Sequence, residues 1–107
     1  MIEIDKEALE PDYPQAKEKD EFRYLAPEWL QAVAEGLTAG AVAHPGETWK
    51  TIPPREHAAR AIRHLNYYRM GDRSENHLVN AAMRCMMAFI TDLIEQRQKL
   101  FTDLLHF

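Results

Sequence analysis

The sequence has few of the residues on which several common kinds of protein site depend. It contains one cysteine, Cys85, which excludes an internal disulfide and is a poor basis for a zinc site. Its one serine, Ser74, precedes a predicted helix, so a serine-based catalytic triad is not expected. The four glycines form no glycine-rich phosphate loop, and neither HxxxH nor HExxH occurs. These absences exclude the most familiar catalytic and metal-binding motifs.

Long apolar runs are also missing, and we find no stretch that approaches the roughly 18–20 apolar residues of a membrane span. Residues 1–10 carry acids where a secretory signal has an apolar segment, which indicates a cytoplasmic protein without a membrane partner. Cys85 lies in the apolar run Met83–Ile90, so we expect a buried, inert thiol.

Negative charge is concentrated at the N-terminus. Residues 1–20 hold seven of the 17 acids and three of the 13 basic residues, which accounts for the whole net charge of -4. The rest of the chain is balanced and lacks the basic footprint of a nucleic-acid-binding protein. Pro11, Pro14 and the lack of a sustained period predict an extended acidic N-terminal arm over residues 1–20. Residues 21–107 then form a single helical domain.

Three segments have the periodicity and boundary residues of α-helices, which predicts an all-α fold. The first begins at Pro27, a residue favoured in a first helical turn, and ends before His44-Pro45-Gly46. Within it, Gly36 and Gly40 lie four residues apart. On a helix they form one flat stripe that a second backbone or a ligand can approach closely.

The second helix is predicted from near Pro54 to Met70, with Gly71 as its stop. Its expected buried face comprises Ala58, Ala61, Ile62, Leu65 and Tyr68 or Arg69. The third is predicted from Glu75 to Leu105, capped by Asp72 or Ser74. Its apolar period comprises Leu78, Ala82, Cys85, Met86, Phe89, Leu93, Leu100 and Leu104. We therefore expect three main helices in an antiparallel bundle with a long C-terminal helix.

The end of the third helix, KLFTDLLHF, holds five large apolar residues in nine positions. A three-helix domain of this size does not easily cover them. Either the N-terminal arm folds over them or the protein associates with itself through this end. We favour a homo-oligomer through the C-terminal helix, because exposed apolar patches usually mark interfaces.

Two polar stripes are the candidate functional residues. Arg60, His64 and Tyr67 share one face of the second helix with Arg63 beside them, and a second stripe follows on the third helix. Arginine matches phosphate geometry, tyrosine can stack on a base, and asparagine can bind the edge of a base. A short turn makes the two helices antiparallel neighbours, although such stripes are also typical of solvated surfaces. With loop residues added, the candidate ligand-binding set is Trp49, Lys50, Arg60, Arg63, His64, Tyr67, His77, Asn80 and Arg84.

Residue spacing does not predict a metal site or a cofactor. His64, His77 and either Asp72 or Glu75 can approach one another in space, but no motif specifies that they do. Clustered carboxylates for magnesium are also lacking. Asp92 and Glu95 lie three residues apart on the third helix, and Glu28 and Glu35 lie seven apart on the first, which is too little for a metal site.

Several segments resemble, in their order, the N-terminal domain of phage dATP/dGTP diphosphohydrolases, a small helical family of phage nucleotide metabolism. The resemblance spans roughly Phe22 to Glu95. Its most specific pieces are the Arg63-His64 run and His77-Leu78 followed by Asn80-Ala81-Ala82. The other matching pieces are FRYLAPEWL at 22–30, Ala34, Gly40-Ala41, the tryptophan of Glu47-Thr48-Trp49-Lys50, and Gly71-Asp72.

The resemblance implies a purine nucleotide as ligand, with Trp49, Arg63, His64, His77 and Asn80 at matching positions. The chain departs from the family in two places. Val42-Ala43-His44 stands where the family has a Lys-Tyr pair, and the segment between Gly71 and His77 is shortened. Both departures fall near the expected pocket and weaken the case for hydrolysis more than the case for binding.

Three functions follow as hypotheses. We favour a non-hydrolysing, oligomeric nucleotide binder that sequesters a purine nucleotide or a cyclic or ADP-ribose-type defence signal in the host cytoplasm. The alternative is a magnesium-dependent dATP/dGTP pyrophosphohydrolase with Asp72, Glu75, Asp92 and Glu95 as metal ligands. The third is a protein-interaction module without a small ligand.

Overall fold

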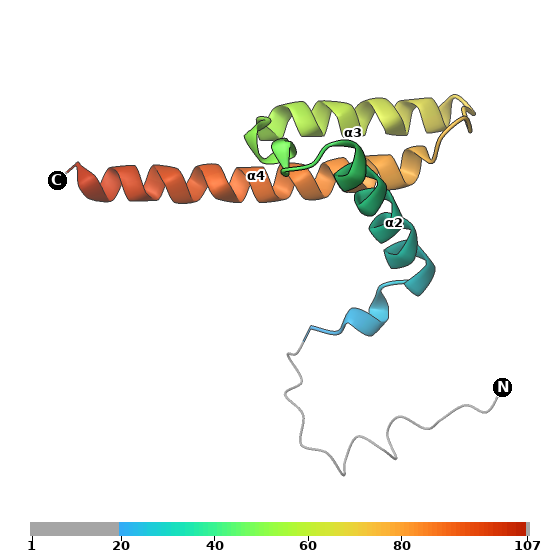
Figure 1. Ribbon diagram of the computed structural model, residues 1–107, viewed down its shortest axis with the longest axis horizontal. Coiled ribbons are helices and arrows are strands. Elements are labelled where there is room, and N and C mark those ends of the chain that lie inside the picture. Colours follow the sequence, from blue (N-terminus) through green and yellow to red (C-terminus); the bar gives the residue numbers. More distant parts are fainter. Residues whose placement is uncertain (1–19, 107) are drawn as a thin grey trace, which may run out of the picture.

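The computed structural model describes residues 20–106, which are mostly helical and include no strand (Figure 1). Three α-helices dominate: α2 (Pro27–Ala43), α3 (Pro54–Arg69) and α4 (His77–Leu105). Two 3-10 turns, η2 (Phe22–Tyr24) and η3 (Thr48–Thr51), precede α2 and α3. The all-α class, the three main helices and the long C-terminal helix are confirmed. Residues 1–19 of the predicted acidic arm lie outside the described residues.

Proline and glycine set the helix boundaries as predicted. Pro27 and Pro54 occupy the first turns of α2 and α3, where a missing N–H costs no helical hydrogen bond. After α2 the chain turns through Gly46 (φ 90°) and Glu47 (φ 53°), and after α3 through Gly71 (φ 89°). A positive φ is inexpensive for glycine, so Gly46 and Gly71 suit these two turns.

The predicted cap of the third helix was wrong. The N-cap is Asn76, whose side chain accepts a hydrogen bond from the Val79 backbone N–H at 3.2 Å. Asp72 instead accepts from the backbone N–H of Ser74 at 2.8 Å and from its hydroxyl at 2.7 Å. Because α4 begins two residues later than predicted, these residues close the turn before the helix rather than cap it.

Helices α3 and α4 run antiparallel and form the main helix–helix contact, as the short turn predicts (Figure 1). Ala61 on α3 and Ala81 on α4 are both only 3% exposed, and His57 of α3 and His77 of α4 are buried with them. Small side chains at a contact let two helix backbones approach closely. The chain therefore buries histidines, which need hydrogen-bond partners, in its principal helix contact.

The predicted buried face of α3 was wrong apart from Ala61. Ile62 is 67% exposed and Leu65 43% exposed, while His57 is fully buried. The sequence pattern places the apolar side chains of α3 toward the core, but α3 meets α4 through His57 and Ala61 instead. The apolar side of α3 is consequently left at the surface of the single chain.

Helix α2 crosses α4 at a steep angle and packs on it through a glycine (Figure 1). A Cβ atom added at Gly36 would lie 2.8 Å from Met83 Sδ and 3.2 Å from Val79 Cγ1. At Gly40, one turn later, an added Cβ would meet nothing within 4 Å. Each glycine thus serves one of the two uses predicted for the stripe. Gly36 lets α4 approach closely, whereas Gly40 borders open space.

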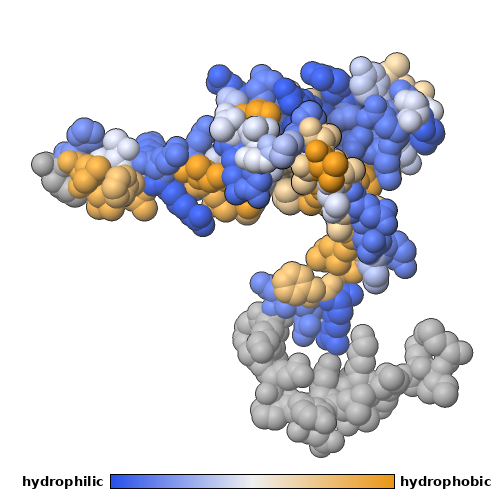
Figure 2. Space-filling view, in the orientation of Figure 1, coloured by the Kyte–Doolittle hydropathy of each residue, from blue (hydrophilic) through white to orange (hydrophobic). Residues whose placement is uncertain are grey.

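One apolar side of α4 has no partner in the described chain. Phe89 is 66% exposed, and Cys85, predicted to be buried, is exposed as well. Beyond α3 the helix continues alone, and apolar side chains gather near its middle and again near its end, with hydrophilic residues between them (Figure 2). Cys85 shares its side of the helix with Leu78 and Phe89, because these positions are seven and four residues away. The exposed apolar residues at the end are Leu100, Phe101, Leu104 and Leu105.

Helix α4 is also long and apolar enough to cross a membrane, judged by length and composition alone. The prediction that no stretch approaches a membrane span was therefore wrong for this helix. Only 22% of its most apolar window is buried within the chain. The core helix of a soluble protein can have the same length and composition, but such a helix is mostly buried.

The contact between α2 and α4 predicts opposite outcomes at the two glycines. Gly36→Val should lower the free energy of unfolding by about 1–3 kcal/mol, because the new side chain overlaps Met83 and Val79. Gly40→Ala is the matched control and should leave stability unchanged or raise it by up to about 1 kcal/mol, since alanine favours helix. Urea denaturation of both variants measures the difference. Equal stability of the two would contradict the packing described.

Candidate functional site

A cavity of about 350 Å³ lies where α2, η3, α3 and α4 meet. Its wall is largely apolar, with Leu37 and Ala41 from α2 and Met83 and Met87 from α4. Gly40 borders it and leaves room for an occupant. A volume of this size lies within the range of small-molecule sites, which are typically apolar with a few polar groups.

The polar side chains that line the cavity include an indole and two guanidinium groups, together with those of His44, Glu47 and Thr48. Trp49 comes from η3, Arg60 from α3 and Arg84 from α4, and all three are partly buried. Neither arginine forms an ion pair with a carboxylate among residues 20–106. Burial lowers the pKa of Arg84, and the positive charge of Arg60 lowers it further. Two partly buried cations close enough to repel each other favour an anion between them.

The fully buried His57 holds this arrangement in place. Its Nε2 lies 2.8 Å from the Trp49 carbonyl oxygen, and Arg84 Nη1 lies 3.2 Å from its Nδ1. Because arginine only donates hydrogen bonds, His57 Nδ1 accepts and Nε2–H donates to the carbonyl. One neutral imidazole therefore connects η3, α3 and α4 behind the cavity.

Lys50 stays at the rim of the cavity rather than inside it. Its ammonium group pairs with the carboxylate of Glu47 and lies 5.6 Å from the centroid of the Trp49 ring. Glu47 itself lines the cavity. The loop thus places one exposed ion pair beside the indole, where it adds little stability.

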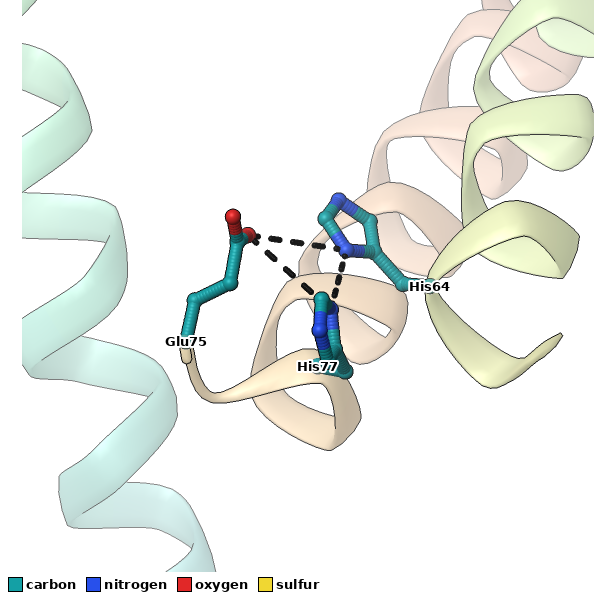
Figure 3. Close-up of side chains that lie close together, drawn as sticks. All are labelled: His64, Glu75 and His77. Atoms are coloured by element: carbon teal, nitrogen blue, oxygen red, sulfur yellow. Dashed lines mark hydrogen bonds and ion pairs between the residues drawn. The ribbon is translucent and has the colours of Figure 1, made fainter. Parts of the chain in front are cut away.

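A second group of polar side chains gathers at the other end of the α3–α4 contact, beside the turn. The Nδ1 atoms of His64 and His77 lie 3.0 Å apart, and Glu75 Oε1 lies 3.7 Å from the first and 4.0 Å from the second (Figure 3). Asn80 donates a hydrogen bond to the same Glu75 oxygen at 2.9 Å. The Tyr67 ring packs against the His77 ring with centroids 5.4 Å apart.

Burial and charge act on this group in different ways. Burial lowers the pKa of His64; Glu75 opposes the shift, while the positive charges of His77, Arg84 and Arg63 add to it. The pKa of Asp72 is also lowered, mainly because its carboxylate accepts two hydrogen bonds from Ser74. The two shifts favour a neutral imidazole at His64 and an ionised carboxylate at Asp72.

The two predicted stripes do face each other, but their residues gather in two separate groups instead of one. Arg60 and Arg84 meet at the cavity with Trp49, whereas the histidines meet at the turn. Arg63 belongs to neither, since it is exposed and borders a separate surface hollow beside Ile62 and Leu65. Sequence reasoning did not find the role of His57. Its signal was its position, one turn before Arg60 on the face that meets α4.

The sequence profile of the family described as "dATP/dGTP diphosphohydrolase, N-terminal" matches residues 10–103. The chain therefore belongs to this family, and the resemblance seen in its short motifs is confirmed. No curated protein and no solved structure matches the chain. The family places the chain in the context of phage-like nucleotide metabolism.

The hydrogen bonds of His57 predict a large effect of its removal. His57→Ala should lower the free energy of unfolding by about 2–4 kcal/mol, because it leaves a cavity and two polar groups without partners. The exposed His106 provides the control, and His106→Ala should change stability by less than about 0.5 kcal/mol. Thermal and urea denaturation measure both. A similar loss in the two variants would rule out a bridging role for His57.

Proposed function

We propose that this member of the dATP/dGTP diphosphohydrolase N-terminal domain family binds a purine nucleotide in the cavity between α2, η3, α3 and α4 without hydrolysing it. The observation that carries the proposal is the meeting of Trp49, Arg60 and Arg84 around one apolar cavity. An indole stacks on a base, and two arginines bind phosphate oxygens.

The arrangement suits the two chemically different halves of a nucleotide. The apolar wall of Leu37, Ala41 and Met87 accepts a flat base that enters past Gly40, where no side chain intrudes. The partly buried Arg60 and Arg84 lack carboxylate partners in the part of the chain that is described, so a phosphate supplies the missing charge. A bound anion also offsets the repulsion between the two guanidinium groups.

The carboxylates assigned to the hydrolase alternative do not support a magnesium site within one chain. Asp72 and Glu75 lie at the turn before α4, whereas Asp92 and Glu95 lie at least 15 residues into it, roughly 22 Å along the axis. A magnesium centre for phosphate chemistry needs its carboxylates close together. The family description keeps hydrolysis as the second candidate, which the experiment below separates from binding.

Sequestration is the role that such a binder would serve. A small phage-type protein that holds a nucleotide and returns it unchanged removes that molecule from solution. The ligand is then a purine nucleotide or a cyclic or ADP-ribose-type signal of host defence, held in the host cytoplasm. The same cavity chemistry, a base beside phosphate, fits all of these.

Nucleotide binding should depend on Arg60 and not on Arg63. Both lie on α3 and carry the same charge, but only Arg60 lines the cavity. With dGTP or dATP, Arg60→Ala should weaken binding at least about tenfold, because it removes a charge-assisted hydrogen bond, while Arg63→Ala should stay within about twofold. Isothermal titration calorimetry measures both affinities, and circular dichroism checks that both variants fold.

The fate of the nucleotide separates binding from catalysis. After incubation with magnesium and heat denaturation, a binder releases the nucleotide intact, as mass spectrometry would detect. Monophosphate formed over many turnovers would instead establish the pyrophosphohydrolase. If neither dATP nor dGTP nor a cyclic dinucleotide shifts the melting temperature, the proposal of nucleotide binding fails. The remaining hypothesis is then a protein-interaction module without a small ligand.

The exposed apolar side of α4 supports the proposal of a homo-oligomer. Phe89 is 66% exposed and Leu100 is 63% exposed, and the eleven-residue separation of these positions places both on the same side of the helix. Phe101 and Leu105 are also more than 60% exposed, on other sides of its last turns. Exposed large apolar side chains of this kind are characteristic of an interface. A second copy presents the same surface, so two chains can cover each other around a two-fold axis.

A carboxylate on the apolar side should prevent this association. Sedimentation velocity should find an oligomer for the unmodified chain and a monomer for Leu100→Glu, because the charge would be buried without a partner. Gln98→Glu places the same carboxylate at an exposed polar position two residues away and should leave the oligomer intact. A monomer at every concentration of the unmodified chain would refute self-association.

A further inference from the structure

Three potential metal ligands converge beside the turn between α3 and α4, outside the cavity described above. His64 comes from the third turn of α3, His77 is the first residue of α4, and Glu75 lies in the connecting turn (Figure 3). His64 Nδ1, His77 Nδ1 and a Glu75 carboxylate oxygen all lie within 4.8 Å of one another. Within residues 20–106, no other group of three such residues meets this criterion.

The separations of these atoms fit a small tetrahedral ion. Ligand atoms bonded to zinc at about 2.0–2.1 Å stand roughly 3.3 Å apart when the angles are tetrahedral. The three pairs here are separated by 3.0, 3.7 and 4.0 Å. Shifts of less than 1 Å therefore bring all three pairs to that separation.

The surroundings of His77 point to a ligand on its Nδ1 atom. His77 is 3% exposed, and its Nε2 is buried without a hydrogen-bond partner in the described chain. The nearest acceptor is Asp72 Oδ2, at 3.5 Å. If Nε2 carries the proton toward this carboxylate, Nδ1 presents a lone pair to His64 and Glu75. A carboxylate behind the far nitrogen of a metal-bound histidine is the usual way to orient that ring.

The other two ligands are held as well. Asn80 donates to Glu75 Oε1 at 2.9 Å, which fixes the carboxylate next to the imidazoles. His64 needs only its Nε2–H tautomer to offer Nδ1, so neither histidine has to become charged. Without a metal, the 3.0 Å approach of the two Nδ1 atoms requires one of them to donate a proton to the other.

We propose that His64, His77 and Glu75 form a binding site for a divalent transition-metal ion of the zinc class. Two imidazoles and one carboxylate favour such an ion over magnesium or calcium, which prefer oxygen ligands. Three protein ligands leave the fourth tetrahedral position to water or to an anion. The site is independent of the nucleotide cavity, because it shares none of the residues that line it.

Titration of the metal-free full-length chain with Co²⁺ and Zn²⁺ tests the proposal. Co²⁺ should bind at one equivalent with the intense visible absorption of a four-coordinate ion, and Zn²⁺ should displace it. Glu75→Gln and His64→Gln should each weaken binding at least about tenfold, as loss of even an outer-shell partner does. Glu95→Gln and His106→Gln change an exposed glutamate and an exposed histidine elsewhere and should leave it unchanged.

A measurement on the unmodified chain makes the result independent of how the variants fold. In a nuclear magnetic resonance spectrum of the histidine rings, one equivalent of Zn²⁺ should shift the ring nitrogens of His64 and His77 and spare those of His44 and His106. Shifts confined to His44 or His106, or spread over all exposed histidines, would overturn the site. Absence of stoichiometric Zn²⁺ binding would also refute the metal site. His64 and His77 would then only share a proton.

Discussion

Two hydrogen bonds of one buried imidazole connect three of the four elements that enclose the cavity, namely η3, α3 and α4. His57 donates to the Trp49 carbonyl and accepts from Arg84, so the position of the η3 turn depends on the α3–α4 contact. Neither bond survives replacement of the ring by an apolar side chain, and both partners are then left in a partly buried place. The η3 turn that carries Trp49 and the guanidinium group of Arg84 are therefore held at the same cavity by a single ring.

The sequence predicts the helices better than it predicts their buried faces. Pro27, Pro54 and Gly71 act locally on backbone angles, so the helix boundaries they mark are nearly correct. Burial is not local. The pattern of Ile62 and Leu65 indicates an apolar side of α3, but it does not say whether that side meets α4 or another chain. Ala61 and Ala81 are both buried, and small side chains allow the two helices to approach closely with the polar side of α3 facing inward.

The candidate residues show the same division between local and tertiary information. An antiparallel α3–α4 pair follows from the short turn, and it brings Arg60 near Arg84 and His64 near His77. The separation into two sites does not follow, because the cavity also needs α2 and η3, which pack through Gly36 and His57. Likewise Glu75 joins the histidines through the path of the turn, which residue spacing does not encode.

The three surfaces of α4 allow its proposed roles to coexist. One residue along a helix is a rotation of about 100°. Leu78 directly follows His77, and Cys85 directly follows Arg84. Phe89 lies on the same side as Cys85, four residues later. The apolar side is therefore turned away from both His77 and Arg84. A second chain can cover it without closing the cavity or displacing a ligand of the histidine cluster. Self-association, nucleotide binding and metal binding thus use different residues of α4. An experiment that refutes one of these proposals does not refute the other two.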